Sequence, residues 1–352
     1  MQLCVFALTV GGAALARRIK DQLGKAGHSA RLFINEEYAE REAGEHLIAG
    51  NLPQLVGDWF ARCDGMIMIM AAGIAVRMVA SYLRDKKSDP AVVVIDERGK
   101  FAISLLSGHL GGANRLAEML ADYLHATPVI TTASDVNKTL ALDELARLRG
   151  WRIENFQQLK RVSAALVNGQ KVVLAVDSKQ LLGSLTLPDN IHLLELGRHP
   201  QPQLRAEDCQ AAVIISSRAE LPQLPINPLV IRPRTVIVGV GCRRGVGGDE
   251  IRNALEEALR WANRTPLAVK CLATIDLKRN ERGLQLAAEE LGWPIVFIPR
   301  EKLVEVEDHF SVSPEVKRCV GVGAVCEPAA FLAGNRPQRV LGKTVFPGVT
   351  AA

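Results

Sequence analysis

Long apolar runs and aromatic side chains are both scarce in this sequence of 352 residues. The longest apolar run, residues 66–76, ends at Arg77 and is too short to cross a bilayer as a helix. The first residues lack the basic segment of a secretory signal, so we expect no signal peptide. Aromatic residues make up only 5% of the chain, and Val, Ile, Leu and Ala must therefore form most of the core. These absences argue against a membrane protein.

Metal-ligating patterns are missing as well. The seven cysteines are scattered without a CxxC pair, and the seven histidines form no HxH, HxxxH or HExxH motif. Zinc sites usually show such spacings, so we expect no metal site in the protein. An odd number of scattered cysteines is typical of a reducing compartment, which predicts free thiols and a cytoplasmic location.

Basic residues only slightly outnumber acidic residues. Lys and Arg number 43 and Asp and Glu 38, which gives a net charge of +5. Nucleic-acid binding usually requires a dense basic stripe, so this balance fits a small acidic ligand better. The chain is 48% hydrophobic and 23% charged, the composition of a globular protein, and its length corresponds to roughly two or three domains.

A strand followed by a glycine turn and a helix recurs three times in the first third of the chain. The turns lie at residues 11–12, 73 and 108–112, and residues 96–99 read as a hairpin or a tight crossover. This alternation predicts an α/β domain over residues 1–135, with an open, largely parallel sheet flanked by helices. Ligands of such sheets bind beyond the carboxyl ends of the strands, so we expect the glycine turns to line the ligand site.

The pattern changes after this domain and then returns. Residues 136–233 combine one predicted helix and two strands with many prolines. We expect a smaller middle α/β domain that ends in a proline-rich linker at residues 219–234. Residues 234–352 restart the strand, turn and helix pattern and predict a C-terminal α/β domain with a second open, largely parallel sheet. The predicted fold class is therefore α/β, with three domains.

The glycine-rich segment SGHLGGAN, residues 107–114, holds the candidate for acid–base chemistry. Imidazole titrates near neutral pH, so His109 on such a loop can act as a general acid or base. The alternative is that His109 only caps the following helix. A triad of Ser107, His109 and Asp135 is geometrically unfavourable, because Ser107 and His109 are too close in sequence. Three glycines would let a bulky ligand approach the backbone: Gly108, Gly111 and Gly112.

A second candidate follows a predicted strand in the last third, at residues 238–244 (VGVGCRR). Gly239, Gly241 and Arg243 form a turn of the kind that binds anions at a helix start. A dinucleotide fingerprint would need its third glycine one place earlier and an acid about 20 residues further on, so this turn is a poor NAD site. A carboxylate-binding turn and a tight turn without a ligand remain as alternatives.

Charged residues near three other turns complete the candidates. Arg77 follows Gly73 by one helical turn and could grip a carboxylate, or it could be a solvated surface residue. Asp276 and Lys278 would share one face of a strand, as ligand contacts or as a simple ion pair. Glu327 lies before a proline at a helix start, where the helix dipole alone favours an acid.

Several of these segments resemble the CbiG family of cobalamin biosynthesis, the cobalt-precorrin-5A hydrolases. SGHLGGAN is specific to that family, whereas the C-terminal segments are shared with a stand-alone relative of the aerobic pathway. The resemblance covers essentially the whole chain, with the same three-part layout and variable middle. It is carried by AGIAVR (72–77), LLSGHLGGANRL (105–116), VITTASD (129–135), VGVGCRR (238–244), ATIDLK (273–278) and VCEPAA (325–330).

The resemblance implies an enzyme of the anaerobic pathway that opens the ring-A δ-lactone of cobalt-precorrin-5A with water. C20 and its methyl group then leave as acetaldehyde, giving cobalt-precorrin-5B. The substrate carries the cobalt, so no cofactor is expected. His109 would act as base, or as an axial ligand of the substrate's cobalt. The backbone amides of Gly111 and Gly112 or the side chain of Asn114 would stabilise the oxyanion, and Ser107 completes the expected catalytic set.

The substrate's acetate and propionate groups would be held by arginines and glycine-rich edges. Besides this small-molecule substrate, transient contacts with neighbouring pathway enzymes and a homodimer are compatible with the resemblance; nucleic acid and membranes are not expected partners. The alternative function is a non-catalytic carrier of a tetrapyrrole intermediate, which acetaldehyde trapping would distinguish. The expected substrate-binding residues are Gly73, Arg77, Gly108, Gly111, Gly112, Gly239, Gly241, Arg243, Asp276, Lys278 and Glu327.

Overall fold

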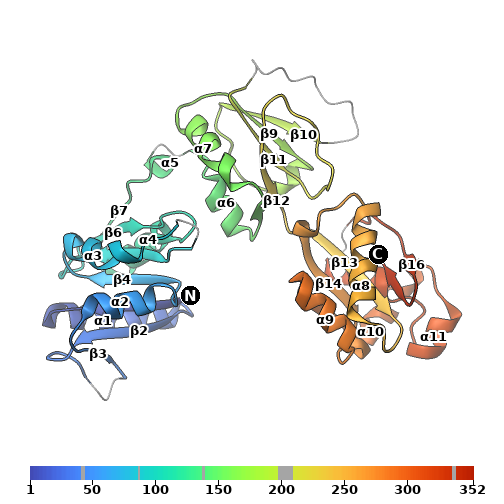
Figure 1. Cartoon of the computed structure of the whole chain (residues 1–352), viewed down its shortest axis with the longest axis horizontal. Helices are drawn as coiled ribbons and strands as arrows, with labels where there is room; N and C mark the ends of the chain where they lie inside the picture. Colours follow the sequence, from blue (N-terminus) through green and yellow to red (C-terminus); the bar gives the residue numbers. More distant parts are fainter. Residues whose placement is uncertain (41–43, 86–87, 137–138, 197–208, 335–337) are drawn as a thin grey trace. The chain divides into compact units, whose positions relative to one another are not determined.

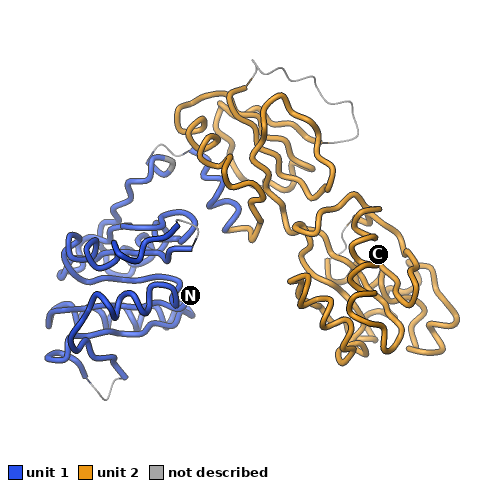
Figure 2. The backbone as a smooth tube through the Cα atoms, in the orientation of Figure 1, with its two compact units in different colours: residues 1–147 blue, residues 148–352 orange. Residues whose placement is uncertain are grey.

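The computed structural model describes residues 1–40, 44–85, 88–136, 139–196, 209–334 and 338–352. Its chain divides into two compact units, residues 1–147 and 148–352 (Figure 2). The first unit contains one sheet and the second contains two (Figure 1). The three sheets are mixed and flanked by helices, and most of their strand pairs are parallel; the last sheet adds the antiparallel pairs β13–β17 and β16–β17. This architecture confirms the predicted α/β fold class.

The first unit has a seven-stranded sheet in the order β3-β2-β1-β4-β5-β6-β7. Its central strands are buried on both faces, as expected for continuous apolar runs in a parallel sheet. The strands are β1 (Gln2–Ala7), β2 (Ser29–Asn35), β3 (His46–Ile48), β4 (Gly65–Ile69), β5 (Ala91–Ile95), β6 (Phe101–Leu106) and β7 (Thr127–Val129).

Helices cover both faces of this sheet. Helices α1 and α4 pack on one face, while α2 and α3 pack on the other. Two short helices, α5 and α6, follow the last strand. The bounds are α1 (Val10–Lys25), α2 (Leu52–Phe60), α3 (Ala72–Val79), α4 (Ala113–Leu124), α5 (Ala133–Val136) and α6 (Leu142–Leu148).

Strand β6 runs antiparallel to β5, with Val92 opposite Leu106 and Ile95 opposite Ala102. The turn between them is therefore a hairpin. Because β7 is parallel to β6, both strands end at the edge where β1, β4 and β5 begin. The three glycine turns each follow a strand, as expected, but they do not share one edge of the sheet. The turn at residues 108–112 lies at the edge opposite the turns at residues 11–12 and 73.

The second unit begins with a five-stranded sheet in the order β10-β9-β11-β12-β8, on which α7 packs. The buried strand β12 lies inside the stretch predicted as a proline-rich linker, so that prediction is wrong for these four residues. Their apolar side chains complete the sheet. The elements are β8 (Arg152–Ile153), α7 (Leu159–Val167), β9 (Val172–Val176), β10 (Ile191–Glu195), β11 (Ala211–Ile215) and β12 (Leu229–Arg232).

The last sheet has the order β15-β14-β13-β17-β16. Helices α8 and α9 cover one face, and α12 packs on the other. The strands are β13 (Val236–Cys242), β14 (Val269–Ile275), β15 (Ile295–Ile298), β16 (Thr344–Phe346) and β17 (Val349–Ala351). The helices are α8 (Gly248–Trp261), α9 (Arg282–Leu291), α10 (Arg300–Val304), α11 (Pro314–Val320) and α12 (Cys326–Ala333).

The domain bounds 1–135, 136–233 and 234–352 stay predictions. None of the helices in the described ranges combines the length and the apolar character needed to cross a bilayer.

Candidate active site

The glycine-rich turn after β6 has a strained and closely packed backbone. Ser107 has a φ of 58° and Gly112 a φ of 84°, both in the left-handed region that favours glycine. A Cβ atom at Gly111 would collide with the Cβ of Ser107, and one at Gly108 would lie 2.7 Å from Oδ1 of Asn114. These glycines therefore allow a compact turn that fixes His109 at its centre.

The imidazole of His109 lies between two carboxylates. Its Nε2 is 2.7 Å from Oδ2 of Asp135, and its Nδ1 is 3.5 Å from Oδ1 of Asp143. Asp143 and Asp135 together raise the pKa of His109 to about 9, although burial opposes this shift. The imidazole is therefore protonated at neutral pH. A protonated imidazole has no free nitrogen lone pair, so this geometry disfavours both the base and the axial-ligand interpretations of His109.

Asn114 links the turn to the segment that carries Asp135. It is buried, accepts a hydrogen bond from Ser104 Oγ at 2.6 Å, and donates to Thr132 Oγ1 and Asp135 Oδ2, each at 3.0 Å. Its amide is thus already engaged and is poorly suited to stabilise an oxyanion. The same holds for the N–H of Gly112, which donates to the carbonyl of His109.

Ser107 is close to this cluster in sequence but not bonded to it. Its Oγ is buried and has no hydrogen-bond partner among the described residues. The pair of His109 and Asp135 therefore forms without Ser107. This agrees with the expectation that Ser107, His109 and Asp135 do not form a catalytic triad. The helix-capping alternative also fails, because the side chain of His109 contacts Asp135 and Asp143 and α4 is preceded by Gly112 as its N-cap.

Helix α6 adds two charged side chains. Glu144 is half-buried, and burial, with the charge of Asp135, raises the pKa of its carboxyl group. Arg147 lies 3.8 Å from Glu144 Oε1. Ligand atoms of His109, Asp135 and Glu144 lie within 4.8 Å of one another and could hold a metal ion, but the imidazolium of His109 would first have to lose a proton. The expectation that the protein holds no metal stays a prediction.

Gly73 and Arg77 lie at the opposite edge of the same sheet. Arg77 is exposed and donates to the carbonyl of Gly73 at 3.2 Å. A groove of about 340 Å³ lies nearby, lined by the ends of β1, β4 and β5. The first unit therefore does not bring Arg77 to His109.

The C-terminal turn is packed around glycines. A Cβ atom at Gly239 would collide with the carbonyl oxygen of Cys326, and one at Gly241 would lie 2.6 Å from Oγ1 of Thr350. These two glycines are therefore required for packing. Arg243 follows them, exposed, at the carboxyl end of β13.

Asp276 and Lys278 form a 3₁₀ turn after β14, so the prediction that they share a strand face is wrong. Lys278 pairs with Glu281 at 3.0 Å, and Glu281 also accepts the N–H of Gly245 at 2.7 Å. Oδ1 of Asp276 is buried without a hydrogen-bond partner in the described ranges. Lys278 is thus near the glycine turn, but it is neutralised by Glu281.

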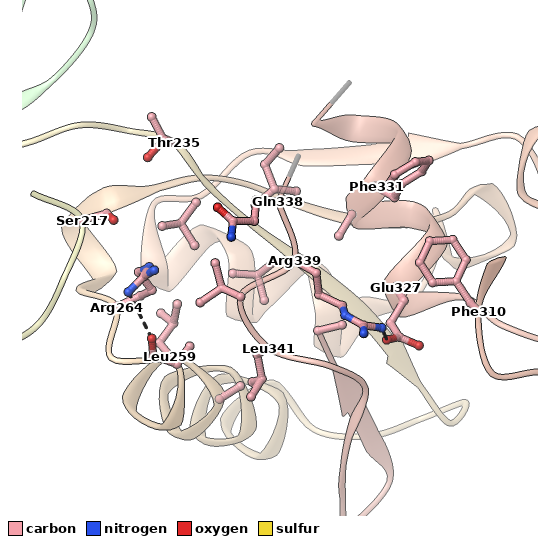
Figure 3. Close-up of a pocket in the computed structure, with 18 residues that line it drawn as sticks. Ser217, Thr235, Leu259, Arg264, Phe310, Glu327, Phe331, Gln338, Arg339 and Leu341 are labelled. Atoms are coloured by element: carbon pink, nitrogen blue, oxygen red, sulfur yellow. Dashed lines mark hydrogen bonds and ion pairs between the residues drawn. The ribbon is translucent and has the colours of Figure 1, made fainter. Parts of the chain in front are cut away.

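Glu327 lies away from Arg243, in a pocket of about 280 Å³. In Figure 3 its carboxylate meets Arg339 at one end of the pocket, close to Phe310, while Arg264 lies at the other end. The ion pair is 3.2 Å long, with Glu327 buried and Arg339 exposed. The structure therefore does not bring together Arg243 and Glu327 at one site.

Sequence reasoning missed Asp143, Glu144 and Arg147. Their spacing predicts an amphipathic helix with one charged face, a signal that was available in the sequence. They lie beyond residue 135, however, where the predicted N-terminal domain ends.

Comparisons with known proteins identify the family. The family model for the cobalamin synthesis G N-terminal region matches residues 54–135, that for the cobalamin biosynthesis central region matches residues 140–233, and that for the cobalamin synthesis G C-terminus matches residues 236–352.

Two curated relatives extend over nearly the whole chain. The cobalt-precorrin-5A hydrolase of Salmonella typhimurium is 38% identical over 346 residues, covering 97% of this chain and 94% of that protein. The protein of the same name from Priestia megaterium is 34% identical over 355 residues, covering 98% and 92%. The crystal structure of a cobalamin biosynthesis protein G homolog from Sulfolobus solfataricus is 22% identical, with a TM-score of 0.42 and coverage of 99% and 96%. The three family models and the two curated relatives show that the chain belongs to the CbiG family of cobalamin synthesis proteins.

Proposed function

We propose that this protein is a cobalt-precorrin-5A hydrolase of cobalamin biosynthesis. Two curated relatives of that name match it over nearly their full length. The observation that supports chemistry at a particular place is His109 between Asp135 and Asp143, because a partly buried, charged acid of this kind is suited to proton transfer.

The proposed reaction has two stages. Water adds to the carbonyl carbon of the ring-A lactone, and the bond from that carbon to the oxygen on C20 breaks. The water oxygen ends in the acetate carboxyl group, and the oxygen on C20 takes a proton. Loss of that proton then drives cleavage of the bond between C20 and the macrocycle. C20 leaves with its methyl group as acetaldehyde, and the macrocycle with its cobalt takes the electron pair.

We assign the two proton transfers of lactone opening to two side chains of the cluster. His109, an imidazolium, donates to the oxygen on C20 as the lactone opens. Glu144 accepts a proton from the attacking water, a task for which a carboxyl group with a raised pKa is suited. Asp135 and Asp143 position the imidazole, and Asn114 holds Asp135. The family resemblance implied His109 as the base; in the proposed mechanism His109 is the acid and Glu144 is the base.

Binding of the macrocycle uses charged groups outside this cluster. Arg243 is exposed at the carboxyl end of β13, so it remains our candidate for an acetate or propionate group. Cobalt belongs to the substrate, and we propose that no further cofactor is needed. A cytoplasmic location, a homodimer and contacts with neighbouring pathway enzymes stay predictions.

The experiment is acetaldehyde trapping under anaerobic conditions, with purified protein and cobalt-precorrin-5A. The wild-type protein should release one acetaldehyde per substrate, whereas a carrier would release none. His109→Ala should slow release by at least about 100-fold and leave substrate binding within about tenfold. His192→Ala, at an exposed position on β10, is the matched control. Full activity of His109→Ala would refute the assignment of this site.

A further inference from the structure

Arg147 lies directly over the glycine-rich turn. A Cβ atom at Gly112 would be 3.6 Å from Cζ and from Nη1 of Arg147, and 3.8 Å from its Nη2. These are van der Waals distances, so the guanidinium packs directly against the backbone of the turn. Gly112 permits the left-handed backbone of this turn.

One edge of this guanidinium makes no hydrogen bond within the described residues. Nε and Nη2 of Arg147 are both buried, and neither has a hydrogen-bond partner in the part of the chain that the structure describes. Glu144 lies 3.8 Å from Nη2, a distance that exceeds a hydrogen bond. Covered donors without partners destabilise a folded protein, and more so when they are charged, so such a group in a native protein calls for an explanation.

Nε and Nη2 form the side of the arginine fork that can bind both oxygens of one carboxylate. The side chain is 29% exposed, so the guanidinium lies at the boundary of the cluster, and a rotation of the side chain can present this edge to a ligand. The other carboxylates of the cluster, Asp135 and Asp143, already face His109. Arg147 is thus the cation of the cluster that has capacity for a further anion.

We propose that Arg147 binds a peripheral carboxylate of the substrate, an acetate or propionate group, beside His109. The identity of this ligand as the substrate rests on the proposed function. Within the first unit, neither Arg77 nor Arg243 can bind a substrate carboxylate next to His109. Arg77 lies at the opposite edge of the sheet, and Arg243 belongs to the second unit.

The test measures binding without turnover. Two probes are used: cobyrinic acid, a cobalt corrinoid whose acetate and propionate side chains are free acids, and the same corrinoid with these side chains converted to amides. Wild-type protein should bind the acid at least about tenfold more tightly than the amide, as expected for one charge-assisted bidentate contact. In Arg147→Gln this preference should fall by about tenfold while affinity for the amide stays within about twofold.

Two further variants control for folding and for general charge. Arg147→Lys should keep part of the preference, because it retains the charge without the fork. Arg115→Gln, an exposed position on α4, should keep all of it. An unchanged preference in Arg147→Gln, or no preference in the wild type, overturns the proposal. If the preference depends on Arg147 but no acetaldehyde is released, the carboxylate site stands and the hydrolase function fails.

Discussion

Asp143 lies 3.5 Å from Nδ1 of His109, and this contact joins helix α6 to the glycine-rich turn. Asp135 faces the other ring nitrogen at 2.7 Å. The result is an imidazole whose charged form is stabilised from both sides. In a hydrolytic site such a group serves as an acid and as an electrostatic stabiliser, rather than as a base.

Replacing Asp143 should weaken this stabilisation. In Asp143→Asn, the pKa of His109 should fall from about 9 by about one unit, because one of the two carboxylates that favour the imidazolium is lost. The measurement is an NMR titration of the His109 ring in protein labelled at histidine. Asp122→Asn, exposed on α4, should leave the pKa of His109 unchanged. An equal pKa in Asp143→Asn would show that this contact has no effect on protonation.

Glu144→Gln removes the proposed base and keeps the shape of the side chain. We expect kcat for acetaldehyde release to fall by about 100-fold or more, with the substrate dissociation constant within about threefold. Glu118→Gln, an exposed position on α4, serves as control. Activity of Glu144→Gln within about twofold of wild type would exclude Glu144 as the base.

Arg77→Ala tests the arrangement of the sheet edges. Because Arg77 and His109 lie at opposite edges, the variant should keep kcat within about twofold, while His109→Ala loses activity by about 100-fold. Single-turnover measurements with saturating enzyme separate this step from binding. A loss of kcat in Arg77→Ala equal to that in His109→Ala would require both residues at one site.

The sequence pattern predicted the central strands of the first sheet, because the buried strands β4 and β5 are unbroken apolar runs, but it missed the four-residue strand β12 among the prolines. Strand direction was less accessible. The hairpin at residues 96–99 was recognised as one of two alternatives, yet only the register of Val92 with Leu106 shows that the turn with His109 reaches the far edge. Whether a strand runs parallel or antiparallel to its neighbour depends on how distant segments pair, and the local sequence pattern does not reveal this.

The candidate site was predicted in part. SGHLGGAN pointed to His109, since an imidazole on a glycine-rich loop can transfer protons near neutral pH. The protonation of His109 could not be predicted, because it depends on Asp143, which a predicted domain end at residue 135 separated from it. Gly239 illustrates the opposite case. It was expected at a ligand edge, but it makes space for the carbonyl of Cys326.

Gly239→Ala should therefore destabilise the C-terminal sheet by about 1–3 kcal/mol or more, since the added methyl group meets the backbone of α12. Gly24→Ala, in helix α1 with open space around it, should instead stabilise the protein by about 0.5–1 kcal/mol. Differential scanning calorimetry of the two variants measures both effects. Unfolding of Gly239→Ala at the wild-type temperature would contradict the packing.

The central claim is that His109 acts as a protonated acid. The most direct test is the pH dependence of the single-turnover rate of acetaldehyde release by the wild-type protein. An acid whose pKa is raised to about 9 is fully active at lower pH and loses activity as pH rises through that value. We therefore predict a rate that falls about tenfold per pH unit above about 9. A rate that instead rises as the pH passes about 9, where the His109 imidazole loses its proton and becomes a base, would contradict the account.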